Sequence, residues 1–211
     1  MRTRSTIALA CLALASLGAQ AVPTFTLLTS TLNGDDQWKL YISTQQPSEG
    51  YQYSNGWGWP ITYTNTQWLP QPATNVNYKD YWLYIWVQDV GGGGPDLLGQ
   101  FKLTGKAGCK FDNGTNSIVT GSVTSTGASY WTVTPALPIS IGGPPVAGYP
   151  AQFTNYFPPF KQPPLIPADL GATGVGPWGL MPGISATAHW ISDPAITSNM
   201  EAWFGTHIHC K

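Results

Sequence analysis

The chain has 211 residues, of which only 9% are charged and 13% are aromatic, and its formal net charge is −1. An ordinary soluble protein has about 25% charged residues, and a nucleic-acid-binding protein carries a basic patch. The composition therefore argues against a partner made of DNA or RNA. Disordered chains are poor in aromatic residues, so the aromatic content indicates a folded chain. The 24 Gly and 19 Pro residues then indicate a turn-rich, extracellular β-protein.

Residues 1–21 show the three parts of a secretory signal peptide. Arg2 and Arg4 make a basic start, residues 7–17 are an apolar run, and a small-x-small triplet ends at Ala21. The apolar run is shorter than the roughly 20 residues that span a bilayer. We therefore expect cleavage after Ala21, a secreted location (extracellular or periplasmic) and no membrane span. A buried helix is the alternative.

The rest of the chain, residues 22–211, reads as short strands bounded by turn residues. Strands are recognised as runs of β-branched and aromatic residues between Gly, Pro, Asn and Asp. In chain order they are expected at residues 24–31, 38–43, 61–63, 81–87, 98–104, 117–123, 130–133, 186–192 and 202–209. Because no helical period extends over 11 residues, the pattern predicts an all-β domain built as a single antiparallel β-sandwich.

Two stretches of the chain are expected to be irregular. Residues 44–60 contain three glycines and predict a long loop, and residues 135–168 predict an ordered excursion rich in Pro and aromatic residues. The run at 81–87 is apolar on both faces, which predicts a strand at the centre of the sandwich.

Cysteine usage predicts one disulfide. Cys11 leaves with the signal peptide, and in an oxidising compartment the two remaining cysteines, Cys109 and Cys210, most simply pair with each other. The bond would tie the C-terminus to the middle of the chain. Two free thiols are the alternative.

Several motifs together resemble those of a known family. They are DDQWKLYI (35–42), YWLYIWVQDVGG (81–92), GPDLLGQF (94–101), LGATGVGPWG (170–179) and ISATAHWI (184–191). They are similar to motifs of secreted, mostly uncharacterised bacterial proteins with a galactose-binding-like jelly roll. The resemblance implies that fold over most of the mature chain, and it implies glycan binding. The chain departs from the family at Ser192, where the family commonly has Trp.

An aromatic-rich stretch is the main candidate for a ligand site. Trp and Tyr rings offer flat faces to the C–H groups of a sugar and polar tips to its hydroxyls. The residues expected to form a glycan platform are Tyr53, Trp57, Trp59 and Trp68. In the alternative these rings fold inward over the core. Trp82, Tyr84 and Trp86 are expected to pack in the core.

Acidic loops suggest a metal. Asp35, Asp36 and Asp89 lie beside glycine-rich turns, and Ca²⁺ takes six to eight oxygen ligands from carboxylates and carbonyls. We therefore consider a structural calcium ion there and expect no other cofactor. The alternative is that these residues only form turns.

A second metal candidate is the pair His207 and His209. Alternate residues of a strand face the same side, so the two imidazoles could hold Zn²⁺ or Cu²⁺, with His189 as the available third imidazole. A disulfide at Cys210 would remove that thiol as a ligand. Asn113 begins an Asn-Gly-Thr sequon and would be modified only in a source that glycosylates secreted proteins.

Enzyme motifs are absent from the sequence, so we expect no catalytic residues. A glycosidase needs two carboxylates across a cleft, and no motif marks Glu49, Glu201 or any Asp as such a pair. The prediction is a secreted, non-catalytic module that recognises a polysaccharide or glycan by aromatic stacking. The main alternative is a structural matrix or surface-coat protein that self-associates or binds a protein partner, and a hydrolase is a third.

Overall fold

A computed structural model gives the fold of this chain. It describes residues 26–45, 49–58, 60–69, 80–105, 108–135, 152–154, 165–175, 178–195 and 201–210. The expected signal peptide and most of the expected excursion at 135–168 lie outside these residues. The described part contains no helix, and so none that could cross a membrane.

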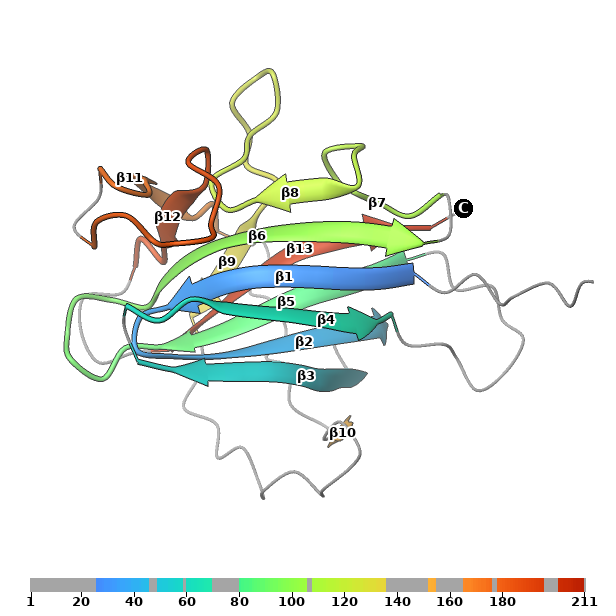
Figure 1. Cartoon of the computed structure of the whole chain (residues 1–211), viewed down its shortest axis with the longest axis horizontal. Helices are drawn as coiled ribbons and strands as arrows, with labels where there is room; N and C mark the ends of the chain where they lie inside the picture. Colours follow the sequence, from blue (N-terminus) through green and yellow to red (C-terminus); the bar gives the residue numbers. More distant parts are fainter. Residues whose placement is uncertain are drawn as a thin grey trace, which may run out of the picture.

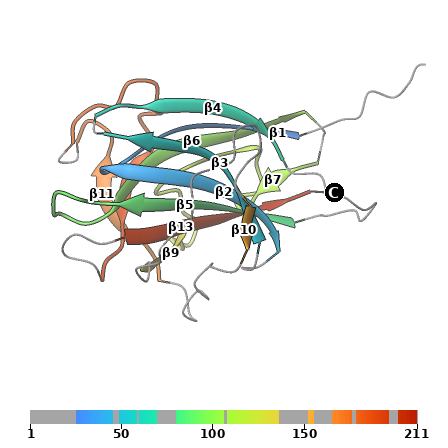
Figure 2. The same ribbon diagram turned by 90° about the horizontal axis from the view of Figure 1, so that it is seen from below.

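The strands form two antiparallel sheets that lie as two layers (Figures 1 and 2). The first sheet has the order β11 (Ala168–Ala172), β12 (His189–Ser192), β6 (Asp96–Gly105), β1 (Thr26–Gly34) and β4 (Tyr63–Trp68), with β8 (Ser117–Val119) also paired to β6. The second has the order β10 (Gln152–Thr154), β3 (Glu49–Trp57), β2 (Gln37–Gln45), β5 (Asp80–Gln88), β13 (Glu201–His209) and β7 (Lys110–Phe111), with β9 (Thr132–Pro135) also paired to β13. The predicted all-β antiparallel sandwich is confirmed.

The main core lies between the sheets and follows from the period-2 alternation of the strands. Strand β5, which pairs with β2 on one side and β13 on the other, points Leu83, Ile85 and Val87 inward, and all three are fully buried. Its predicted place at the centre of a sheet is therefore correct.

The outer face of the second sheet carries a separate aromatic cluster. It consists of the buried residues Tyr41, Tyr84, Trp86 and Trp203, with the partly buried Trp82 packed against them. Gly205 pairs with Tyr84, and a Cβ at position 205 would lie 3.1 Å from the Tyr84 ring. The absence of a side chain there lets the ring lie on the sheet. Strand β5 is thus buried on both faces, as its sequence indicates.

The prediction of a long loop at residues 44–60 is wrong, because residues 49–57 form strand β3. Gly56 is one of the glycines that suggested a loop, yet it pairs with Trp38 within the sheet. A Cβ at Gly56 would overlap the buried Trp38 indole, so this glycine makes room for a side chain and not for a turn. Strand β4 also extends beyond the short strand expected at 61–63, and β8 ends before position 123.

The predicted disulfide is confirmed, since Cys109 and Cys210 are bonded across a sequence separation of 101 residues. Cys109 precedes β7 and Cys210 follows β13, and these two strands pair at Ile208 and His209. The bond therefore fixes the end of the central strand β13 to the short strand beside it.

Candidate functional site

The two ends of the sandwich carry different side chains. We call one end the acidic end and define it by Asp35, Asp36, Asp89 and Asp96, which lie in the β1–β2 turn and in and after the β5–β6 loop. At the left of Figure 1, strands β1, β3 and β5 end and β2, β4 and β6 begin at this end. The opposite end carries the disulfide and the C-terminal histidines.

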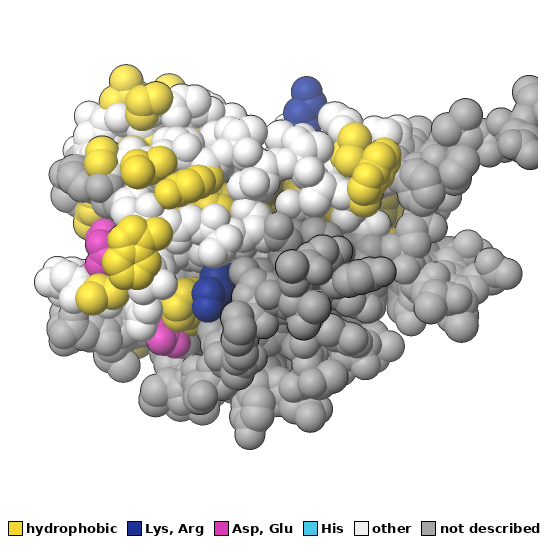
Figure 3. All heavy atoms as spheres, turned by 60° about the horizontal axis from the view of Figure 1, so that its bottom comes forward, with side chains coloured by type: hydrophobic (Ala, Val, Ile, Leu, Met, Phe, Trp, Pro, Cys, Tyr) yellow, Lys and Arg dark blue, Asp and Glu magenta, His cyan; other side chains and the backbone are white. Residues whose placement is uncertain are grey.

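Trp57 is held at the acidic end with its side chain in solvent. It is 59% exposed and closes β3. The Tyr63 hydroxyl donates to the Trp57 carbonyl at 2.7 Å, and the next residue, Gly58, donates its N–H to the Asp36 carbonyl at 2.7 Å. Figure 3 shows hydrophobic side chains next to carboxylates at this end.

Trp68 lies elsewhere, although it is equally open at 55% exposed. It closes β4, whereas Tyr63, the residue bonded to Trp57, opens that strand. Five residues of strand span about 17 Å, so Trp57 and Trp68 do not form the single platform that was expected. The Tyr53 side chain and Trp59 lie outside the described residues.

The carboxylates of Asp36 and Asp89 are occupied by backbone amides. Asp36 accepts from Val90 at 2.7 Å and Gly91 at 3.1 Å. Asp89, only 3% exposed, accepts at one oxygen from Gly91 and Gly92 and at the other from Gly94, all within 2.9 Å. Gly92 and Gly94 have φ of +88° and +109°, which suits glycine. This geometry favours the turn-forming alternative, and the calcium site stays a prediction.

Two carboxyl groups at the acidic end have raised pKa values. Burial, followed by the charges of Asp36 and Asp89, raises the pKa of Asp35 to about 6, although the nearby Trp178 indole opposes the shift. Burial also raises the pKa of Asp96 to about 7, and neither of its buried carboxyl oxygens has a hydrogen-bond partner in the described part of the chain. Near neutral pH these two groups can therefore hold a proton and donate a hydrogen bond as well as accept one.

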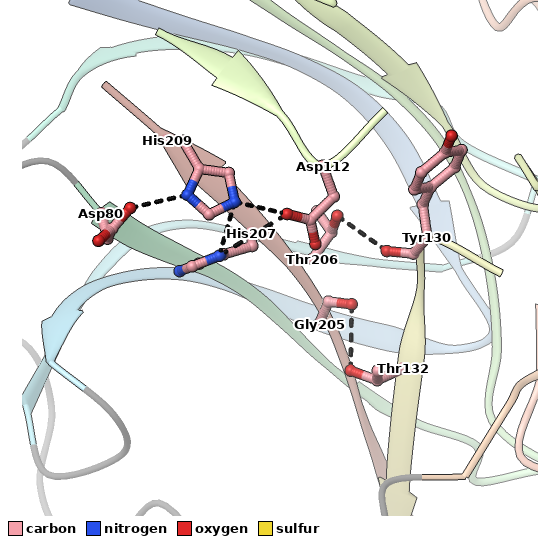
Figure 4. A network of polar contacts seen from close by, with 8 residues as sticks. All are labelled: Asp80, Asp112, Tyr130, Thr132, Gly205, Thr206, His207 and His209. Carbon is pink, nitrogen blue, oxygen red and sulfur yellow. Dashed lines mark hydrogen bonds and ion pairs between the residues drawn. The ribbon is translucent and has the colours of Figure 1, made fainter. Parts of the chain in front are cut away.

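A second cluster lies at the opposite end and joins His207, His209, Asp80 and Asp112 (Figure 4). His209 Nδ1 is 2.7 Å from Asp80 Oδ1, and His209 Nε2 is 2.7 Å from Asp112 Oδ1. His207 Nδ1 lies 3.0 Å from His209 Nε2. Asp80, His207 and His209 each offer a ligand atom within 4.8 Å of the others. Asp112 Oδ1 also lies 2.7 Å from His209 Nε2 and 3.7 Å from His207 Nδ1.

The two histidines share one face, as predicted, but His189 is not their third partner. His189 belongs to β12 of the other sheet, and its Nδ1 lies 2.8 Å from Asp169 Oδ2. The sequence pattern missed Asp80 and Asp112 because each reaches the histidines only through strand pairing, β5 and β7 with β13. The signal that could have found Asp80 was its position directly before the strand expected at 81–87, in alternation with Trp82.

The cluster also shifts the pKa values of its members. Burial alone would raise the pKa of Asp112, but the neighbouring His207 and His209 imidazoles outweigh it, and the pKa lies below its usual value. Burial alone would lower the pKa of His209, but the bonds to Asp80 and Asp112 outweigh it, and the pKa is raised. Both shifts favour the charged forms of His209 and Asp112.

The remaining candidates have structural contacts. Glu201 accepts from the Trp86 indole at 3.0 Å and from the Gln88 amide at 2.9 Å on the outer face of the second sheet. The Glu49 side chain lies outside the described residues. Asn113 accepts from the Thr115 backbone N–H at 2.9 Å and donates to the Ser117 carbonyl at 2.7 Å, which closes a local turn.

Comparisons with known proteins returned no family model, no curated protein and no solved structure that matches this chain. The resemblance to galactose-binding-like proteins stays a prediction from the sequence motifs. The function is therefore argued from the geometry of the two ends of the sandwich.

Proposed function

We propose that this chain is a secreted, non-catalytic β-sandwich that binds a carbohydrate at its acidic end. The observation that carries the proposal is the position of Trp57. Its side chain is 59% exposed while its backbone is fixed by Tyr63, and the neighbouring Gly58 is bonded to Asp36 of the acidic turn. A rigid, exposed aromatic ring beside polar groups is the arrangement that recognises a sugar.

The chemistry at this end suits a hydroxyl-rich ligand. The Trp57 ring would cover the apolar C–H face of one sugar ring, while the Asp35 carboxyl would exchange hydrogen bonds with hydroxyls. Asp35 is half-buried, so its side chain has less conformational entropy to lose on binding than a fully exposed one. Such a site would bind without any covalent step.

Secretion belongs to the same proposal. The Cys109–Cys210 disulfide supports it, because such bonds persist in oxidising compartments. The signal-peptide pattern of residues 1–21 agrees with that location.

The test is polysaccharide binding by Trp57→Ala and Trp68→Ala, two variants that remove similarly exposed tryptophans from the ends of two different strands, β3 and β4. Calorimetry against a panel of neutral and acidic polysaccharides measures the affinity. We expect Trp57→Ala to weaken binding at least tenfold, about 1.4 kcal/mol, and Trp68→Ala to change it less than twofold.

Two outcomes would overturn the proposal: no binding to any member of the panel, or equal weakening in both variants. Sedimentation of the wild-type chain over a range of concentrations adds the second readout. Concentration-dependent assembly without glycan binding would favour the structural, self-associating alternative.

A further inference from the structure

We propose that His207, His209 and Asp112 form a binding site for a divalent transition-metal ion of the zinc class, with Asp80 orienting His209 from behind. The site lies at the end opposite the proposed glycan site and does not depend on it. Figure 4 shows the four side chains gathered over the end of β13.

The fold brings these residues together through strand pairing. His207 and His209 are alternate residues of β13 and face the same side of the sheet. Asp80 of β5 is paired with His209 of β13. Asp112 directly follows β7, which pairs with the other side of β13 and also reaches His209. The Asp112 N–H also donates to the His207 carbonyl at 3.2 Å, which fixes the turn that carries its carboxylate.

The spacing of the three donor atoms suits tetrahedral coordination. His207 Nδ1, His209 Nε2 and Asp112 Oδ1 are separated by 3.0, 2.7 and 3.7 Å. Bonds of about 2.0–2.1 Å to zinc place tetrahedral ligands about 3.3 Å apart, so small rotations of the side chains would suffice. The His209 side chain is 50% exposed and that of Asp112 is 36% exposed, which leaves an open side for a water as the fourth ligand.

The hydrogen-bonding needs of His209 also point to a cation. His209 Nδ1 faces Asp80 Oδ1 at 2.7 Å, while His209 Nε2 lies 2.7 Å from Asp112 Oδ1 and 3.0 Å from His207 Nδ1. One proton on Nε2 would have to serve two acceptors, whereas a metal ion would satisfy all three atoms at once. A carboxylate behind a metal-ligating histidine is the usual outer-shell arrangement.

The surroundings hold the ligands in place. The His207 ring packs on the Trp82 ring with centroids 4.2 Å apart, and Trp82 stacks on Tyr84 in turn. The Cys109–Cys210 disulfide flanks the site, next to His209 on one strand and three residues before Asp112 on the other. Lys110 of β7 is paired with His209 in the sheet, and its side chain is exposed.

The donor set selects the class of ion. Two imidazoles and a carboxylate suit Zn²⁺ and also Cu²⁺, while Ca²⁺ and Mg²⁺ take oxygen ligands only. Both described cysteines are bonded to each other, so no thiolate contributes.

The experiment titrates the chelator-treated chain, with its disulfide intact, with ZnCl₂ in a calorimeter. Co²⁺ replaces zinc in a parallel titration, because tetrahedral Co²⁺ has strong visible absorption bands. We expect one equivalent of each ion to bind, and no heat from CaCl₂. Failure of the wild-type chain to bind zinc at 1 mM would overturn the proposal.

Variants then assign the ligands. We expect His209→Ala and Asp112→Asn to abolish the cobalt bands, and Asp80→Asn to weaken zinc binding about 10- to 100-fold, as for other outer-shell partners. His189→Ala removes a histidine from a His–Asp pair in the other sheet and serves as the matched control, with unchanged affinity expected. Asp112→Asn is a conservative surface change, so it tests the ligand assignment even if His209→Ala fails to fold. Unchanged zinc binding by Asp112→Asn, or equal loss in His189→Ala, would overturn the assignment.

Discussion

Asp36 and Gly91 lie 55 positions apart in the chain, and a hydrogen bond of 3.1 Å from the Gly91 N–H to the Asp36 carboxylate joins them. Asp36 belongs to the turn that connects the two sheets between β1 and β2. Gly91 belongs to the loop that connects them again between β5 and β6. This contact therefore ties two crossings between the sheets together at the acidic end.

The first prediction concerns Asp89, which organises the same loop. Asp89→Ala leaves the N–H groups of Gly91, Gly92 and Gly94 without their buried acceptor. Hydrogen bonds to a charged group contribute about 1.5–3 kcal/mol each, though not additively, so we expect a loss of about 3 kcal/mol in the free energy of unfolding. Urea denaturation measures it.

Asp169→Ala is the control for this prediction. Asp169 also accepts a backbone N–H, that of Gly171, but its side chain is 54% exposed. Its loss also breaks the exposed pair with His189, and it should cost no more than about 1 kcal/mol, since water replaces both contacts. Equal destabilisation by the two variants would contradict the role given to Asp89.

The second prediction is a pH dependence that comes from Asp96. Its pKa is about 7 in the folded chain and 3.8 in the unfolded reference. Between these values the folded state binds more protons, so the stability falls as the pH rises from about 4 to 7. Asp35 and His209 contribute in the same direction, because their pKa values are also raised.

Asp96→Asn isolates the contribution of this one group. We expect a higher Tm than the wild type at pH 8, where Asp96 is a buried charge, and a flatter Tm profile between pH 5 and pH 8. Thermal unfolding at several pH values measures both. Parallel profiles for wild type and variant would show that Asp96 titrates normally.

The strands were predictable where a local sequence pattern was enough to show both the strand and its environment. The run at Tyr81–Val87 is apolar on both faces because both faces of β5 are covered, and the two mature cysteines had one simple pairing. Strand β3 was missed because Gly56 reads locally as a turn residue. The reason for this glycine is the indole of Trp38 on the neighbouring strand, which only the paired sheet makes visible.

The candidate sites were predictable in part for the same reason. The shared face of His207 and His209 follows from alternation within one strand. The participation of Asp80, 129 residues from His209, depends on the pairing of β5 with β13, which no local pattern contains. Likewise, the stretch from Tyr53 to Trp68 suggested one platform because the full length of β4, which carries Trp68 away from Trp57, was not foreseen.

The third prediction concerns the disulfide. Replacing both Cys109 and Cys210 with Ser opens a loop of about 100 residues, which the chain-entropy model values at about 3–5 kcal/mol. We expect the urea midpoint of the double variant to fall to that of the reduced wild-type chain. Added reductant should lower the wild-type midpoint and leave the double variant unchanged, and a wild type that does not respond would contradict the prediction.

The fourth prediction separates the anchoring of Trp57 from its stacking. Tyr63→Phe removes the hydroxyl that donates to the Trp57 carbonyl at 2.7 Å and accepts its N–H at 3.4 Å. The ring of residue 63 would still pack edge-on against Trp38, with centroids 5.6 Å apart as in the wild type. Stability should therefore fall by only about 0.5–1.5 kcal/mol.

Glycan affinity should fall more clearly than stability in this variant. The exposed indole keeps its surface but loses the contact that orders its backbone, so binding pays the cost of ordering it again. We expect a loss of about three- to tenfold, smaller than that of Trp57→Ala, measured by calorimetry with the polysaccharide that binds the wild type. Tyr130→Phe makes the same chemical change next to β13, where the Tyr130 carbonyl accepts from Thr206. An affinity loss in Tyr130→Phe equal to that in Tyr63→Phe would show that anchoring of Trp57 is not the cause.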